Sequence, residues 1–181
     1  MALDRAIRWR PVQGTGLEHL HLTETGDGIL ARSAVIGTDD GLAFGARHEI
    51  HLESDWTFRS LLLERMDGAR LILERDSNGD WRREGTPLPA LAGCIDIDIA
   101  ATPFTNTLPM RRTTFEPGQP QRFHMAWIPL DSLEPMVDEQ IYTKRDDRRF
   151  RYQAADGSFE AELTLDDDGL VVDYPGLFVR G

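Results

Sequence analysis

Hydrophobic and polar residues alternate along most of the chain. The alternation has a period of two in eight segments: LEHLHLT (17–23), ILARSAVI (29–36), FGARHEIHLE (44–53), WTFRSLLLE (56–64), RLILERD (70–76), QRFHMAWI (121–128), RRFRYQA (148–154) and FEAELTL (159–165). Successive side chains of a β-strand point to opposite faces of a sheet, so this period predicts half-buried strands. The chain is therefore expected to be mainly β.

Short glycine-containing segments separate these predicted strands. They are TGDG (25–28), TDDG (38–41), MDG (66–68), DSNGD (76–80), ADG (155–157) and DDDG (166–169). Asn-Gly and Asp-Gly sequences suit hairpin turns, in which the backbone takes positive φ angles. The pattern predicts an antiparallel sandwich, roll or barrel. No linker or repeat divides the chain, so we expect a single domain over residues 1–181.

Two segments are candidate helices. Residues 132–142 place apolar side chains near helical spacing, but Pro135 lies inside the segment and argues against a helix there. The second candidate starts after Thr102, which is positioned to cap a helical turn that Pro103 begins. We expect Pro109 to end that turn.

The stretch CIDIDIA (94–100) brings two carboxylates together. As a strand, it would place Asp96 and Asp98 on one face and the isoleucines on the other. Arg111 and Arg112 follow after a turn, and only one of two adjacent residues is expected to serve the aspartate face. Three interpretations stay open: a structural ion pair, a polar floor for a ligand, and an acid–base pair for catalysis.

Composition and charge exclude several functions. The formal net charge of −11 argues against nucleic-acid binding. No segment is apolar enough to span a bilayer, and the first residues lack the apolar core of a signal peptide, so we expect a cytoplasmic protein without a transmembrane segment. The single cysteine, Cys94, is expected to be a buried apolar residue. His19 and His21 share a strand face, but we expect no metal or cofactor.

Aromatic residues lie mostly on the apolar side of their predicted strands. Two interpretations stay open: these rings fill a core, or they line a cavity for a lipid. The residues concerned are Trp56, Phe58, Phe123, Trp127, Phe150, Tyr152, Phe159, Tyr174 and Phe178.

Several motifs resemble those of a known bacterial family. They are GLEHL (16–20), DWRREGTPLPALAGC (80–94), GCIDIDIAATPFTNTLPMRR (93–112), MAWIPL (125–130), EQIYTKRD (139–146), RFRYQ (149–153) and GLVVDYPGLFVR (169–180). The chain resembles a glycolipid-binding family, once classed as a domain of unknown function, whose ligand is itself inferred from shape. The resemblance runs nearly end to end.

The resemblance implies a fold and a place to look for a site. The fold would be a spiral β-roll, a long antiparallel sheet of about 15 short strands wrapped around a single helix, seen as a homodimer and similar to bacterial lipoprotein carriers. It implies no catalytic residues. The motif positions at which we expect a polar ligand-binding site are Glu18, Asp96, Asp98, Thr105, Asn106, Arg111, Arg112, Tyr142, Tyr152, Asp173 and Tyr174.

These observations favour a binding protein over an enzyme. We expect it to hold a lipid or glycolipid, with the tail against the aromatic interior and the polar head near Asp96, Asp98, Arg111 and Arg112. One alternative is a hydrolase-type enzyme that uses Asp96 and Asp98 on a small glycosylated or anionic substrate. Another is a dimeric protein-interaction module.

Overall fold

The protein is mainly β, as the alternation predicts. The computed structural model describes residues 3–39 and 41–181, so the turn expected at 38–41 includes one residue, Asp40, outside the described part. The fifteen strands of the described residues are β1 Asp4–Pro11, β2 Leu17–Thr25, β3 Gly28–Asp39, β4 Leu42–Leu52, β5 Phe58–Arg65, β6 Arg70–Arg75, β7 Trp81–Arg83, β8 Thr86–Pro87, β9 Asp96–Ile99, β10 Pro120–Ile128, β11 Met136–Asp146, β12 Arg149–Ala154, β13 Glu160–Leu165, β14 Val171–Tyr174 and β15 Phe178–Arg180.

All fifteen strands belong to one open sheet. Its order is β8-β7-β6-β5-β4-β3-β2-β1-β15-β14-β13-β12-β11-β10-β9. The first and last strands of the chain pair antiparallel in the middle of the sheet, with Trp9 opposite Arg180. Two meanders thus lead away from this seam: the first meander is β1–β8, and the second meander is β10–β15. The strands β9 and β10 are parallel, whereas the other neighbours pair antiparallel.

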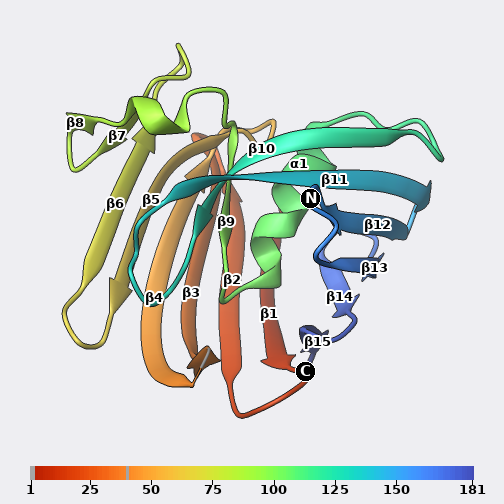
Figure 1. The fold of residues 1–181 in the computed structure, drawn as a ribbon, viewed down its shortest axis with the longest axis horizontal. Helices are drawn as coiled ribbons and strands as arrows, with labels where there is room; N and C mark the ends of the chain where they lie inside the picture. Colours follow the sequence, from red (N-terminus) through yellow and green to blue (C-terminus); the bar gives the residue numbers. More distant parts are fainter. Residues whose placement is uncertain (1–2, 40) are drawn as a thin grey trace.

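The sheet curves around a short helical segment (Figure 1). This segment consists of a 3-10 turn, η2 Pro103–Asn106, followed directly by the helix α1 Thr107–Arg112. Phe104 and Leu108 pack in the larger apolar cluster with β1–β7, whereas Met110 packs in a second cluster with β11–β14. The helical segment therefore contributes to the core of both halves. This arrangement confirms the expected roll, a long sheet wrapped around a single helix.

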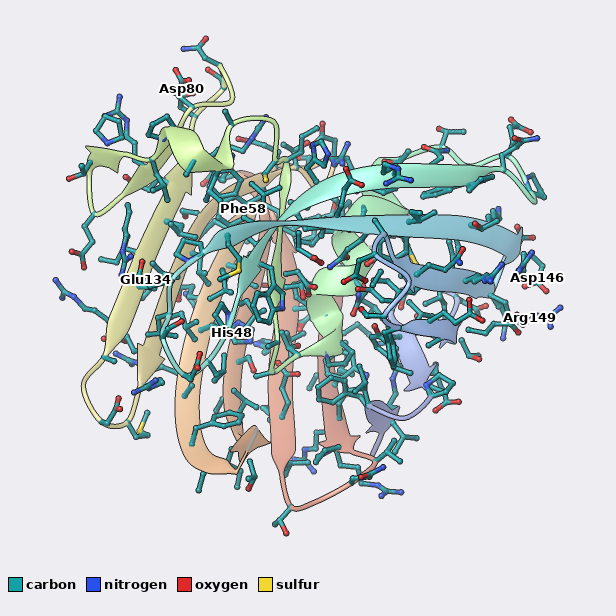
Figure 2. All side chains as sticks on the ribbon, in the orientation of Figure 1. His48, Phe58, Asp80, Glu134, Asp146 and Arg149 are labelled. Carbon is teal, nitrogen blue, oxygen red and sulfur yellow. The ribbon has the colours of Figure 1, made fainter. Side chains whose placement is uncertain are left out.

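The rolled sheet contacts itself where the β10–β11 connection crosses the first meander. Arg65 on β5 donates from Nη1 to the carbonyl oxygens of Leu130 (2.6 Å) and Asp131 (2.5 Å). Glu134 forms an ion pair with Arg83 of β7 and lies beside the β5–β6 side of the sheet in Figure 2. These contacts fix the overlap of the two halves.

The helical segment starts as predicted but ends later. Thr102 Oγ1 accepts a hydrogen bond from the backbone N–H of Phe104 (3.1 Å), and Pro103 is the first residue of η2. The prediction that Pro109 ends the segment is wrong, because α1 continues to Arg112. Pro109 is the third residue of α1, and proline is tolerated in the first turn of an α-helix.

Residues 132–142 are not helical. From Met136 onward they form β11, which pairs antiparallel with β10, and Leu133 has a positive φ of 55°. The helical spacing of the apolar residues has no effect here because pairing with β10 and β12 supplies the backbone hydrogen bonds on both sides of the strand. No helix of the described residues is both long and apolar enough to cross a membrane.

Replacement of Leu108 tests the role of the helix in the core. Leu108 is fully buried, so Leu108→Ala removes packed methyl groups and is expected to lower the free energy of unfolding by about 3 kcal/mol. The control is Met66→Ala at a side chain that is 70% exposed, which is expected to change stability by no more than about 0.5 kcal/mol. Urea denaturation measures both. Equal effects of the two substitutions would show that the roll does not depend on the helix.

Candidate functional site

An open pocket lies where the ends of several strands of the second meander meet the helical segment. Its volume is about 420 Å³, within the range of small-molecule sites. We call it the acidic pocket, and its lining residues are Asp98, Ile99, Ala100, Thr102, Asn106, Trp127, Met136, Val137, Asp138, Tyr152, Ala154, Ser158, Phe159, Tyr174, Leu177 and Phe178.

A chain of side-chain hydrogen bonds supports the polar side of this pocket. Asn106 Nδ2 donates to the hydroxyl of Tyr142 (2.9 Å), which donates to Gln140 Oε1 (3.0 Å). Gln140 Nε2 donates to Asp98 Oδ2 (2.7 Å) and to Asp138 Oδ2 (3.0 Å). One amide thus holds two carboxylates, and its orientation is fixed by a buried phenol.

The 3-10 turn completes the hold on Asp98. Thr105 Oγ1 donates to Asp98 Oδ1 (2.9 Å), and the same oxygen accepts from the backbone N–H of Ile99 (3.2 Å). Thr105 is fully buried, so water does not compete for its hydroxyl. Each Asp98 oxygen therefore has one fixed donor and lone pairs left to accept from a ligand.

Strand alternation explains how β11 reaches the pocket. Asp138, Gln140 and Tyr142 are separated by two residues each, so all three point to the inner face of the sheet. Asp98 lies on β9, opposite Trp127 of β10, the strand next to β11. The register between β9, β10 and β11 thus brings the two aspartates to the same amide.

The electrostatics of the pocket are unusual for a binding site of phosphates. Burial raises the pKa of Asp98 and the charge of Asp138 raises it further, while hydrogen bonds from Gln140 and Thr105 oppose the shift. Among the described lining residues there is no lysine, arginine or histidine. No group of three or more His, Cys, Asp or Glu in residues 3–39 and 41–181 is arranged to hold a metal ion.

Aromatic rings form the opposite wall. The ring centroids of Tyr152 and Tyr174 are 5.9 Å apart, and Phe159 lies 6.0 Å and 6.1 Å from them. Behind this wall, Tyr142 packs edge-on against Tyr152 at 5.4 Å. Burial raises the pKa of all three tyrosines, so they are neutral hydroxyls at physiological pH.

Asp96 belongs to a separate ion pair. Arg112 donates to it through two nitrogens, at 2.7 Å from Nη2 and 3.2 Å from Nε, and only 1% of Asp96 is exposed. Arg111 is exposed instead and lies over the ring of Trp56, 4.9 Å from its centroid. As expected, only one of the two arginines reaches an aspartate, but Arg112 pairs with Asp96 alone and Asp98 accepts from Thr105 and Gln140 instead.

Glu18 and Asp173 lie apart from the acidic pocket's polar network. Glu18 is on β2, where its Oε1 accepts from Ser33 Oγ (2.7 Å) and contacts His48 Nε2 (3.2 Å). Asp173 directly precedes Tyr174 on β14, so the two side chains point to opposite faces of the sheet. Of the eleven expected site residues, those gathered at or directly behind the pocket are Asp98, Thr105, Asn106, Tyr142, Tyr152 and Tyr174.

Several residues of the acidic pocket are not among the positions expected from the sequence. Asp138 and Gln140 are not among the expected positions, because the sequence does not predict a strand over residues 136–146. Interpreted as a strand, the residues Asp138, Gln140 and Tyr142 would have been assigned to one face. Ser158 lies in a turn, and no sequence signal separates it from other turn residues.

Comparisons with known proteins agree with this architecture. Residues 6–180 match the model of a protein family described as "Putative glycolipid-binding". Among solved structures, the chain is similar to a DUF1089 family protein from Pseudomonas aeruginosa, with 36% sequence identity and a TM-score of 0.83 over 93% of this chain and 94% of that chain. No curated protein matched. The family match spans the helical segment, the acidic pocket and all of the sheet except the start of its first strand, β1.

The raised pKa of Asp98 predicts a pH-dependent contribution to stability. Folding favours the protonated carboxyl, so the cost of burying its charge disappears as the pH falls toward the ordinary carboxyl pKa of about 3.9. Asp98→Asn has no such titration. We expect the wild type to gain stability relative to this variant as the pH is lowered from about 7 to about 4, by about 1.4 kcal/mol per unit of pKa shift.

Urea denaturation at several pH values measures this difference. The matched control is Asp80→Asn, which removes an exposed carboxylate from the turn between β6 and β7 (Figure 2). A stability difference between the wild type and Asp98→Asn that stays constant with pH would contradict the assignment of a buried, costly charge to Asp98.

Proposed function

The chain belongs to the family described as "Putative glycolipid-binding", and from this premise we propose that it binds an amphiphile whose uncharged, hydroxyl-rich head occupies the acidic pocket. The observation that carries the proposal is the lining itself. Two carboxylates face a wall of aromatic rings, and no cationic side chain is among the described lining residues.

Hydroxyl groups suit both parts of this lining. A sugar-like head has several O–H donors, and carboxylate oxygens accept such hydrogen bonds more strongly than neutral acceptors do. The less polar faces of such a head can pack on Tyr152, Phe159 and Tyr174, as ligands commonly do in pockets with aromatic walls. A phosphate or sulfate head would instead meet Asp98 and Asp138 without a compensating positive charge.

The mouth of the pocket provides a surface for the tail. Met136, Val137 and Leu177 line it and are 49%, 46% and 40% exposed. Large apolar side chains gathered at the edge of a pocket are typical of contacts with lipids or proteins. An alkyl chain that leaves the pocket past these residues would cover them.

The pocket also bears on the alternative of a hydrolase. Asp96 is paired with Arg112, so the carboxylates that face a ligand are Asp98 and Asp138 rather than Asp96 and Asp98. The raised pKa of Asp98 is the observation that favours acid–base chemistry there. Release of glucose from an alkyl glucoside by the purified protein would support this alternative.

Titration with matched alkyl ligands tests the binding proposal. We expect n-octyl β-D-glucoside, below its micelle concentration, to bind more tightly than methyl β-D-glucoside, which lacks the tail, and more tightly than octyl phosphate, which has a charged head. Asp138→Asn removes one charged acceptor and is expected to weaken octyl glucoside binding about tenfold. Isothermal titration calorimetry measures these affinities.

A control variant and further measurements delimit the result. Asp80→Asn, with the same loss of charge at an exposed turn, is expected to bind octyl glucoside as the wild type does. Equal affinity for octyl phosphate and octyl glucoside would overturn the proposed head group. Native mass spectrometry of the purified protein would reveal a lipid that is retained from the cell, and size-exclusion chromatography would show whether the apolar mouth is covered in a homodimer.

A further inference from the structure

A second pocket lies on the first meander, against the seam between β1 and β15. Its volume is about 320 Å³. We call it the Glu18 pocket, and its lining residues are Trp9, Pro11, Gln13, Leu17, Glu18, Val35, Ile36, Gly37, Thr38, Phe44, Ala100, Ala101, Gly176, Leu177 and Phe178. It shares Ala100, Leu177 and Phe178 with the acidic pocket, so the two pockets are neighbours on either side of these residues.

One carboxylate oxygen in this pocket has an unmet hydrogen-bonding capacity. Glu18 is 97% buried, since only 3% of it is exposed, and its Oε2 has no hydrogen-bond partner among the described residues. The other oxygen, Oε1, contacts Ser33 and His48. A buried acceptor that is left without a donor costs about 1–3 kcal/mol, and more when it is charged. A donor that enters the pocket would remove this cost.

The register of the sheet explains why protein donors reach only one side of Glu18. Ser33 on β3 and His48 on β4 are directly opposite each other, and both approach Glu18 of β2 from the same side, because β3 and β4 follow β2 in the sheet. His48 lies among the strands of the first meander in Figure 2. The side of Glu18 that faces the pocket is bordered by Trp9 and Val35, which are buried, and Val35 has no side-chain donor.

Trp9 cannot supply the missing donor. Its indole N–H already donates to the carbonyl oxygen of Val171 at 2.8 Å. The rest of the described lining is mostly apolar, and Leu17, Ile36 and Leu177 at its rim are 43%, 61% and 40% exposed. No lysine or arginine is among these lining residues, so a negatively charged ligand would meet Glu18 without compensation.

We propose that the Glu18 pocket is a second binding site, which takes an apolar molecule with a single hydrogen-bond-donating end group, a hydroxyl or an amine, that donates to Glu18 Oε2. The apolar part of the molecule lies against Val35, Phe44 and Phe178. This site differs from the acidic pocket in chemistry, because its lining has one carboxylate, Glu18, rather than the pair Asp98 and Asp138.

Eight-carbon ligands with different end groups test this proposal. The ¹⁵N-labelled protein is titrated with 1-octanol, octylammonium and octanoate, and amide chemical shifts report the site. We expect 1-octanol and octylammonium to shift the amide signals of Gly37 and Thr38 in the Glu18 pocket at lower ligand concentrations than the amide signal of Ser158 in the acidic pocket. Whichever of 1-octanol and octylammonium shifts these amides at the lower concentration shows whether an alcohol or an amine is the better ligand. Octanoate is expected to bind at least about tenfold more weakly.

Two variants separate the role of Glu18 from that of the apolar pocket. Glu18→Gln is expected to weaken 1-octanol binding about tenfold, whereas Glu74→Gln, with the same charge change at an exposed position of β6, leaves it unchanged. Thr38→Trp places a large ring at the exposed rim and is expected to abolish binding while Glu18 stays intact.

The outcomes that would overturn the proposal are distinct. If octanoate binds as tightly as 1-octanol, or Glu18→Gln has no effect, the end group does not donate to Glu18. If none of the three ligands shifts Gly37 and Thr38, the pocket holds only water. Binding of octyl glucoside in the acidic pocket would stand in either case, because its shifts appear at Ser158.

Discussion

The inside of the roll has to be filled by very little helix. Fifteen strands curve around η2 and α1, which together run only from Pro103 to Arg112. Phe104 and Leu108 reach one apolar cluster and Met110 reaches the other, so the same short segment joins the cores of both meanders. Where the helical segment does not reach, aromatic rings and buried polar groups occupy the interior, and open pockets remain, among them the acidic pocket and the Glu18 pocket. The pockets therefore exist because the helical segment is too short to fill the inside of the roll.

The polar groups of the interior are of two kinds. Asn106, Tyr142 and Gln140 satisfy one another in sequence and leave carboxylate lone pairs directed at a pocket. Asp96 and Arg112 satisfy each other and stabilise the junction between β9 and α1. Burying a charged or polar group without a partner is costly, so a fold retains such groups where they are paired or where a ligand completes them. Asp96 is thus a structural aspartate, whereas Asp98 faces a pocket.

Much of the fold follows from local patterns, whereas the site depends on strand register. Period-two alternation and glycine turns predicted β2–β6, β10, β12 and β13, because each signal lies within a few residues, but they did not predict the long strands β1 and β11. The acidic pocket needs β9 to pair parallel with β10, which places Asp98 near Asp138, forty residues along the chain. Glu18 likewise depends on Ser33 and His48, which lie on two following strands. Sequence spacing carries no information about such distances without the sheet order.

The seam between β1 and β15 has a consequence for the folding kinetics. Trp9 and Arg180 come from opposite ends of the sequence, so their pairing closes nearly the whole chain into one loop. The hairpins within each meander need only local closure and can form early. Contacts of such high sequence separation raise the contact order and slow folding. We therefore expect the terminal strands β1 and β15 to pair late in folding. Until then, each half presents an unpaired strand edge on which another chain can pair.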